Sequence, residues 1–194
     1  GERVADVCAA PGGKSFTLAQ WMENRGALLA GDLYAAKCDV MEARAAELGV
    51  EILQTVVRDA SAPCPEPLVG SFDRVLCDVP CSGLGVIRRK PEIRYKPLED
   101  FSSLPELQYA ILDRSASMVR SGGTLQYSTC TLNPAENEEI AQRFLREHPE
   151  FRPRTLPLAP WFAMAGREPG ASITLFPHIH NTDGFFIAGF VKMG

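Results

Sequence analysis

The apolar residues of the chain follow two patterns that alternate along most of its length. Short apolar runs of the kind found in buried strands recur, and segments with apolar residues at helical spacing separate them. The runs cover residues 4–8, 27–31, 51–57, 72–77 and 124–128, and the helical segments cover residues 16–22, 35–48, 104–119 and 135–147. Strands that alternate with helices are typical of an α/β protein with a mostly parallel sheet. We expect that fold class here.

The last third of the chain is less regular. A proline-rich connection, residues 152–169, precedes two further strand-like runs, residues 172–176 and 184–191. A hairpin of this kind adds antiparallel strands to one edge of a parallel sheet. The pattern therefore predicts an antiparallel C-terminal edge.

Length and composition indicate one globular domain. The chain has 194 residues, of which 45% are hydrophobic and 23% are charged, so it can bury a full core. No apolar run approaches the roughly 18 residues of a membrane-spanning helix, and the start does not resemble a signal peptide. We expect a cytoplasmic protein with no membrane contact. The chain begins at Gly1 and enters a strand at once, which indicates a fragment.

The cysteines do not form a disulfide or metal-binding pattern. Six cysteines lie at irregular spacing, and no C-x-x-C pair occurs. A chain of this size does not need disulfides to fold, so we expect reduced thiols. The ligand spacing also predicts no metal site.

The stretch after the fourth predicted strand carries most of the candidate chemistry. DVPCSGLG, residues 78–85, places a carboxylate, a proline and a thiol within four residues, followed by two glycines. Ligands bind at the carboxyl ends of strands in open α/β sheets, and Cys130 leaves the fifth strand at the same edge. The alternative is a tight turn with a buried structural cysteine.

The loop after the first strand predicts a nucleoside ligand. It ends in Gly13-Lys14-Ser15, but a P-loop would need a glycine where the chain has Cys8, and the Rossmann G-x-G-x-x-G is also absent. The remaining option is a nucleoside without a pyrophosphate, such as S-adenosylmethionine. Its ribose would bind Asp32 and its adenine Asp59. The alternative for Asp32 is an N-cap of the following helix.

Basic charge is concentrated beside the thiol loop. The formal net charge of the chain is −4, which argues against indiscriminate nucleic-acid binding by the whole surface. Residues 86–96 nevertheless carry five basic side chains and one acidic one, Glu92. Such a run is often only a solvated face, but its position favours contact with a polyanion. The basic residues are Arg88, Arg89, Lys90, Arg94 and Lys96.

Two cysteines that converge on one cleft indicate nucleophilic chemistry on an electrophilic ring. Carbon 5 of cytosine is a poor nucleophile, and a thiolate that adds to carbon 6 turns the ring into an enamine that can accept a methyl group. A base must then remove the carbon 5 proton, and the thiol must leave. Lys14 would favour the thiolate, and Asp78 would stabilise a proton at the N3 edge. The residues alone do not say which thiol attacks.

Four groups of motifs are spread over nearly the whole chain. They are DVCAAPGGK (residues 6–14), DVPCSGLG (78–85), YSTC (127–130) with NP (133–134) and ENE (136–138), and TDGFF (182–186). Together they resemble the motifs of the Sun (Fmu, NSUN) family of RNA cytosine-5 methyltransferases, with the bacterial small-subunit ribosomal RNA enzymes most similar. The resemblance implies a Rossmann-like class I S-adenosylmethionine-dependent methyltransferase fold. It also implies that Cys130 attacks carbon 6 and that Cys81 aids proton removal and product release.

The resemblance implies further site residues. Lys14 and Asp78 would act in catalysis. Cofactor contacts would come from Cys8, Ala9, Ala10, Pro11, Gly12, Gly13, Lys14, Asp32, Lys37, Asp59 and Asp78. The RNA would contact Arg88, Arg89, Lys90 and Arg94, although Arg94-Tyr95 stands where the family often has a tryptophan.

The resemblance also sets the expected partners. The substrate would be RNA, most specifically 16S ribosomal RNA, with transfer RNA as the alternative within the same family. The product would be S-adenosylhomocysteine, no metal would take part, and the chain would be a monomer. Residues 1–194 would form the methyltransferase catalytic domain without its start and without the upstream RNA-binding region.

Two other functional classes stay open. A cysteine acyltransferase or hydrolase would pair Cys81 or Cys130 with a histidine and would not bind the cofactor. A non-catalytic RNA-binding module would not need Cys130.

Overall fold

The structure is a computed structural model that describes residues 1–156 and 170–194. Eight strands in these ranges form one sheet. Their bounds are β1 (Arg3–Asp6), β2 (Ala27–Asp32), β3 (Leu53–Val57), β4 (Phe72–Asp78), β5 (Val119–Thr129), β6 (Phe151–Pro153), β7 (Ser172–Leu175) and β8 (Phe185–Lys192). The strand order is β3-β2-β1-β4-β5-β8-β6, and β7 also pairs with β8. The first five strands are parallel, whereas β8 runs antiparallel to β5, β6 and β7.

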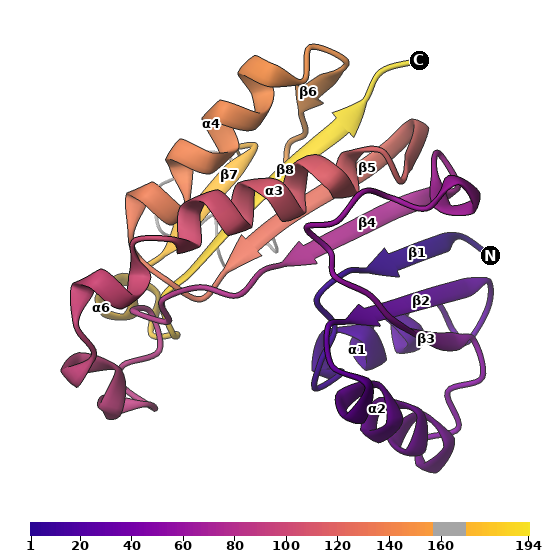
Figure 1. The fold of residues 1–194 in the computed structure, drawn as a ribbon, viewed down its shortest axis with the longest axis horizontal. Coiled ribbons are helices and arrows are strands. Elements are labelled where there is room, and N and C mark those ends of the chain that lie inside the picture. The colour runs from indigo at the N-terminus through magenta and orange to yellow at the C-terminus, as the bar shows by residue number, and fades with distance from the viewer. Residues whose placement is uncertain (157–169) are drawn as a thin grey trace.

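The helices lie on opposite faces of this sheet, with α1 and α2 on one face and α3 and α4 on the other. Figure 1 shows α3 and α4 together beside β4, β5 and β8, and α1 and α2 beside β2 and β3. The longer helices are α1 (Gly13–Trp21), α2 (Ala35–Glu47), α3 (Leu104–Ala116) and α4 (Glu138–Glu147), and α6 (Pro177–His180) is a single short turn. Short 3₁₀ turns are η1 (Glu66–Leu68), η2 (Pro91–Tyr95), η3 (Leu98–Phe101) and η4 (Pro134–Glu136).

Both faces of the sheet are buried, as the alternation of side chains along β1 shows. Val4 packs with Ala19 of α1, whereas the next residue, Ala5, belongs to the main core with Leu112 of α3 and Phe144 of α4. Successive side chains of a strand point to opposite faces. Helices therefore cover both faces, which explains why the strands read as continuous apolar runs.

The predicted fold class is confirmed. The sheet is mostly parallel, and the predicted pair of C-terminal strands, β7 and β8, is antiparallel. Most of the predicted proline-rich connection, from residue 157 to residue 169, lies outside the described residues.

Several element boundaries differ from the predictions, and one strand is not predicted at all. The strand β5 begins at Val119, not at residue 124, because the Ser-Gly-Gly segment forms a bulge within the strand instead of ending a helix. The predicted helix from residue 135 begins only at Glu138, because Asn137 has the non-helical backbone angles φ −117° and ψ −96°. The three-residue strand β6 was missed, since its apolar content is too small to form a run.

None of the helices in the described ranges is long and apolar enough to cross a membrane.

Two glycines hold three loops together at the carboxyl edge of the parallel strands. The Gly85 N–H donates to the Cys130 carbonyl at 2.9 Å, and the Gly184 N–H donates to the Gly85 carbonyl at 2.8 Å. A Cβ atom at Gly85 would lie 2.2 Å from the Gly184 oxygen and 2.7 Å from the Cys130 oxygen. The loops after β4 and β5 and the loop before β8 therefore meet through backbone atoms, in a space that excludes a side chain.

We expect Gly85→Ala to lower the free energy of unfolding by about 2–3 kcal/mol, because overpacking against backbone cannot relax by a side-chain rotation. Gly13→Ala is the matched control, since a Cβ atom there would meet nothing within 4 Å. It should change stability by less than about 1 kcal/mol. Urea unfolding followed by circular dichroism measures both variants. Equal midpoints for Gly85→Ala and the parent chain would contradict the contact.

Candidate active site

Acidic residues gather at the edge to which the arrows of β1, β4 and β5 point in Figure 1. Asp6, Asp32 and Asp78 are the last residues of β1, β2 and β4, and Asp59 lies two residues beyond the end of β3. Parallel strands bring their carboxyl ends to one edge, which is where open α/β sheets bind ligands. The predicted site residues Asp32, Asp59 and Asp78 therefore lie along one edge of the sheet, and Asp6 lies there with them.

The structure brings Cys81 and Cys130 into contact. Their Sγ atoms lie 3.2 Å apart, and the Cys130 backbone N–H donates to Cys81 Sγ at 3.3 Å. Both residues are half-buried. Cys81 Sγ thus accepts a hydrogen bond from the backbone and can donate its own proton to Cys130 Sγ.

This contact gives the two thiols different acidities. The hydrogen bond from Cys81 stabilises the Cys130 thiolate and lowers the pKa of Cys130 to about 7, against the opposing effects of burial and of Asp78, with help from Lys14. The same hydrogen bond and burial raise the pKa of Cys81. A thiolate is the nucleophilic form of cysteine, so the geometry favours Cys130 as the nucleophile of the pair.

Lys14 and Asp78 form an ion pair beside the thiols. Lys14 Nζ lies 2.6 Å from Asp78 Oδ2 and 5.4 Å from the centre of the Phe185 ring. Asp78 Oδ1 accepts a hydrogen bond from Ser128 Oγ at 2.8 Å. The Lys14 side chain is 45% exposed. A substrate at this edge can therefore reach the ammonium group.

The glycine loop, residues 8–14, leads from β1 into α1. Gly12 is the N-cap of α1, and its φ of 102° is a left-handed conformation that favours glycine. The Gly12 N–H donates to the Ala9 carbonyl at 2.7 Å, and the Ala9 N–H donates to the Gly31 carbonyl at 2.8 Å. The loop is thereby tied to the end of β2. At Gly13 the backbone faces open space.

Asp32 connects this loop to α2. Its carboxylate accepts hydrogen bonds from the backbone N–H groups of Ala10 at 3.3 Å and Tyr34 at 3.2 Å, and Lys37 Nζ lies 3.7 Å away. The N-cap of α2 is Tyr34. The alternative interpretation of Asp32 as that N-cap is therefore wrong.

Asp59 and Cys8 each lie two residues beyond the end of a strand, β3 and β1 respectively, at the same edge of the sheet. Asp59 is exposed, and hydrogen bonds from the Ser61 hydroxyl and backbone N–H hold its pKa below its usual range. Burial raises the pKa of Cys8. A ligand at Cys8 would thus meet a neutral thiol, and one at Asp59 an ionised carboxylate.

The basic segment is anchored next to the thiol loop. The side chain of Ile93, in η2, is buried beside Gly83. Arg89 Nη2 lies 2.6 Å from Asp183 Oδ2, which joins the segment to the loop before β8. The expected RNA-contact residues Arg88, Arg89, Lys90 and Arg94 are all exposed.

The sequence interpretation missed the role of two buried polar residues. Glu136 and Asn137 are 0% and 1% exposed, although the helical pattern placed Glu136 in an exposed first turn. Asn137 accepts a hydrogen bond from Thr129 Oγ1 at 2.5 Å and donates to the Thr131 carbonyl at 3.0 Å, on either side of Cys130. The sequence feature that could have indicated this role is the polar ENE motif, residues 136–138, which follows the Cys130 loop closely.

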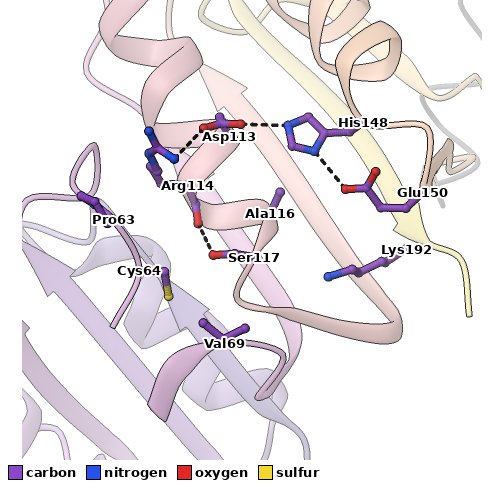
Figure 2. Close-up of a pocket in the computed structure, with 10 residues that line it drawn as sticks. All are labelled: Pro63, Cys64, Val69, Asp113, Arg114, Ala116, Ser117, His148, Glu150 and Lys192. Carbon is purple, nitrogen blue, oxygen red and sulfur yellow. Dashed lines mark hydrogen bonds and ion pairs between the residues drawn. The ribbon is translucent and has the colours of Figure 1, made fainter. Parts of the chain in front are cut away.

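A hollow of about 500 Å³ lies at the opposite edge, near the amino ends of β4 and β5 (Figure 2). His148 lies between two carboxylates there, with Nε2 3.0 Å from Asp113 Oδ1 and Nδ1 3.0 Å from Glu150 Oε1. The lining includes neither Cys81 nor Cys130. The size of this hollow is therefore a poorer guide to the reaction than the thiol contact.

Comparison with known proteins gives one family for the chain. The family model described as "16S rRNA methyltransferase RsmB/F" matches residues 1–191. The chain is 42% identical over 201 residues to a probable ribosomal RNA small subunit methyltransferase B from Bacillus subtilis, covering 100% of this chain and 44% of the relative. It is 36% identical to ribosomal RNA small subunit methyltransferase F from Erwinia tasmaniensis, covering 99% and 40%. The chain thus spans less than half the length of these relatives.

Solved structures agree with the family match. NSun6 from Pyrococcus horikoshii with SFG superposes with a TM-score of 0.82 and 30% identity, covering 100% of this chain and 48% of that one. A methyltransferase homolog protein from Pyrococcus horikoshii gives a TM-score of 0.81 and 32% identity, covering 100% and 62%.

We expect alkylation of Cys130 by iodoacetamide to rise with a midpoint near pH 7, since only the thiolate reacts. Cys81→Ala removes the hydrogen-bond donor, so the midpoint should move up toward the ordinary value of 9.0, by roughly one to two pH units. Mass spectrometry of the Cys130 peptide gives the rates, and Cys64→Ala is the control because Cys64 lies at the opposite hollow. An unchanged midpoint in Cys81→Ala would contradict the proposed hydrogen bond.

Proposed function

The chain belongs to the RsmB/F (Sun/Fmu) family of 16S rRNA methyltransferases, and from this premise we propose that it transfers a methyl group from S-adenosylmethionine to carbon 5 of a cytosine in RNA. The observation that carries the proposal is the contact between Cys81 and Cys130 beside the Lys14–Asp78 ion pair. In this proposal 16S ribosomal RNA is the substrate and residues 1–194 act as a monomeric catalytic domain. Transfer RNA is the alternative substrate.

The residues at the strand ends fit S-adenosylmethionine. Asp32 and Asp59 offer carboxylate acceptors for the hydroxyl and amino groups of a nucleoside, and the backbone of residues 8–14 has open space at Gly13. Lys37, beside Asp32, and Asp78 would be the remaining residues in contact with the cofactor. When bound, S-adenosylmethionine would supply an electrophilic methyl group.

The thiols would perform the covalent steps. The Cys130 thiolate would form a bond from Sγ to carbon 6, and the ring electrons would move to carbon 5, which takes up the methyl group. Asp78, held by Lys14, would stabilise a proton at N3. Cys81 would then aid transfer of the carbon 5 proton to solvent. The electrons of that C–H bond re-form the ring double bond, and those of the C–S bond return to Cys130 as thiolate.

The histidine contacts do not favour a cysteine hydrolase. His148 binds Asp113 and Glu150 at the opposite hollow, and His180 Nδ1 accepts a hydrogen bond from the Phe176 N–H at 2.9 Å. These contacts are to carboxylates and to the backbone, whereas hydrolase chemistry pairs an imidazole with the attacking cysteine. The Cys81 thiol, with its Sγ 3.2 Å away, is the group in contact with Cys130 Sγ.

The target cytosine must leave its stack to reach the thiols, so an accessible loop nucleotide is the expected site. The exposed basic segment would bind the backbone on either side of it.

We expect Cys81→Ala to form a stable covalent adduct with 16S ribosomal RNA in the presence of S-adenosylmethionine, because addition by Cys130 proceeds while release stalls. A denaturing gel should show a shifted protein band, which disappears in the double variant with Cys130→Ala. Cys130→Ala alone should reduce methylation at least 1,000-fold, roughly the loss expected for a missing nucleophile. Cys64→Ala should behave as the parent chain.

The same experiment separates the competing mechanisms. Absence of any adduct while S-adenosylhomocysteine still binds, as measured by calorimetry, would overturn the covalent mechanism. Full methylation by Cys130→Ala would overturn its assignment as the nucleophile.

We expect the triple change of Arg88, Lys90 and Arg94 to Ala to weaken RNA binding and to reduce the slope of log K against log salt by about two to three, since each lost phosphate contact removes about one unit. Arg25, Arg44 and Arg146, changed together to Ala, give a control with the same net charge on other elements. Filter binding at several salt concentrations measures both. An equal loss of slope in the two triple variants would contradict a specific role for the segment.

A further inference from the structure

Glu136 is a buried carboxylate that binds both thiol loops. Its Oε1 accepts hydrogen bonds from Ser82 Oγ at 2.6 Å and Asn133 Nδ2 at 3.0 Å. Its Oε2 accepts from the Ser82 backbone N–H at 2.9 Å and from Gln108 Nε2 at 2.9 Å. Ser82 follows Cys81 directly, and Asn133 lies three residues after Cys130. One side chain therefore joins the loops that carry the two thiols.

The four donors balance a charge that burial would otherwise make costly. An ionised carboxylate away from water costs several kcal/mol unless it is paired or hydrogen-bonded. Among the described residues Glu136 forms no ion pair, so neutral donors stabilise its charge. Charge-assisted hydrogen bonds of this type are short and strong. The four hydrogen bonds therefore fix the Glu136 carboxylate relative to Ser82, Gln108 and Asn133.

Gln108 connects Glu136 to the residue on the other side of Cys81. Its Nε2 donates both to Glu136 and to the Pro80 carbonyl, each at 2.9 Å. Pro80 and Ser82 flank Cys81, and Ser82 Oγ also lies 2.7 Å from Thr131 Oγ1. The position of Cys81 is thus set from both sides by the Glu136–Gln108 pair.

The Cys130 loop has a second side-chain support, Asn137. Asn137 binds Thr129 and Thr131, on either side of Cys130. The hydrogen bond from the Gly85 N–H to the Cys130 carbonyl joins the two loops and so supports both of them. A change at Glu136 should therefore displace Cys81 more than Cys130.

We propose that Glu136 is a positioning residue that holds Cys81 against Cys130 and is thereby required for product release more than for addition to the base. The part about release rests on the proposed function. The part about thiol position does not.

Glu136→Gln is the sharpest test because it keeps the shape and removes two acceptor positions. Whichever oxygen is replaced, the new NH₂ group faces at least one N–H donor, from Asn133 or from Gln108 and the Ser82 backbone. Glu139→Gln is the control, since Glu139 is exposed on the same segment. Urea unfolding first selects conditions in which each variant is folded. Ser82→Ala, which removes one of the four donors, is the milder second variant.

The first readout is the pH dependence of Cys130 alkylation in the absence of RNA and cofactor. Lys14, Asp78 and Cys81 are the groups that act on this thiol, and only the contribution of Cys81 should change. We expect the midpoint to rise by roughly half to one pH unit in Glu136→Gln, by less in Ser82→Ala and not at all in Glu139→Gln. A folded Glu136→Gln protein that titrates as the parent chain would overturn the proposal.

The second readout is the covalent adduct with 16S ribosomal RNA. Glu136→Gln should accumulate adduct at least tenfold above the parent chain, whereas overall methylation falls. Equal loss of adduct and of methylation would show that Glu136 is needed for the addition of Cys130 to the base, and would overturn its role in product release. If Cys81→Ala itself gives no adduct, the proposed function fails, and the thiol titration still decides whether Glu136 positions Cys81.

Discussion

The parallel pairing of β4 with β5 is the constraint on which the site depends. Its register places Asp78 opposite Ser128, so the loops that carry Cys81 and Cys130 leave the sheet at the same level and on neighbouring strands. A slip of one residue would turn every side chain of one strand to the other face. It would also remove the hydrogen bond from Ser128 to Asp78. The contact between the Cys81 and Cys130 sulfur atoms therefore depends first on the register of β4 and β5, and only then on the structure of the two loops.

Two carboxylates near the thiols are stabilised in different ways. Asp78 is paired with the half-exposed Lys14, a cation on a flexible stem that can move toward a substrate. Glu136 is held by donors on Ser82, Gln108 and Asn133 in the interior. The first arrangement suits a group that meets the substrate, and the second suits a group that keeps its neighbours in place. Chemistry and support are thus assigned to separate carboxylates.

The sequence predicts the fold class and places both thiol loops at one sheet edge, but it does not predict the buried contacts that join these loops. Alternating apolar patterns gave the α/β class, because both faces of the sheet are buried and local periodicity reports burial. The acidic strand ends and the two thiol loops followed from the topology. Glu136 did not, because its donors come from three segments and no local pattern records their meeting. For the same reason the apolar pattern predicts the fifth strand only from residue 124, although β5 pairs with β4 from Val119 and the glycines between form a bulge.

The close approach of Gly85 and Gly184 has a consequence at the level of the genetic code. Either position would bring an added Cβ atom within 3 Å of backbone atoms of another loop. Every missense change that a single base substitution can make in a glycine codon introduces a residue with a Cβ atom. No single-base change that replaces either glycine by another residue can therefore preserve the contact. Drift at these two positions is limited to silent changes, unless a second change in a facing loop makes room.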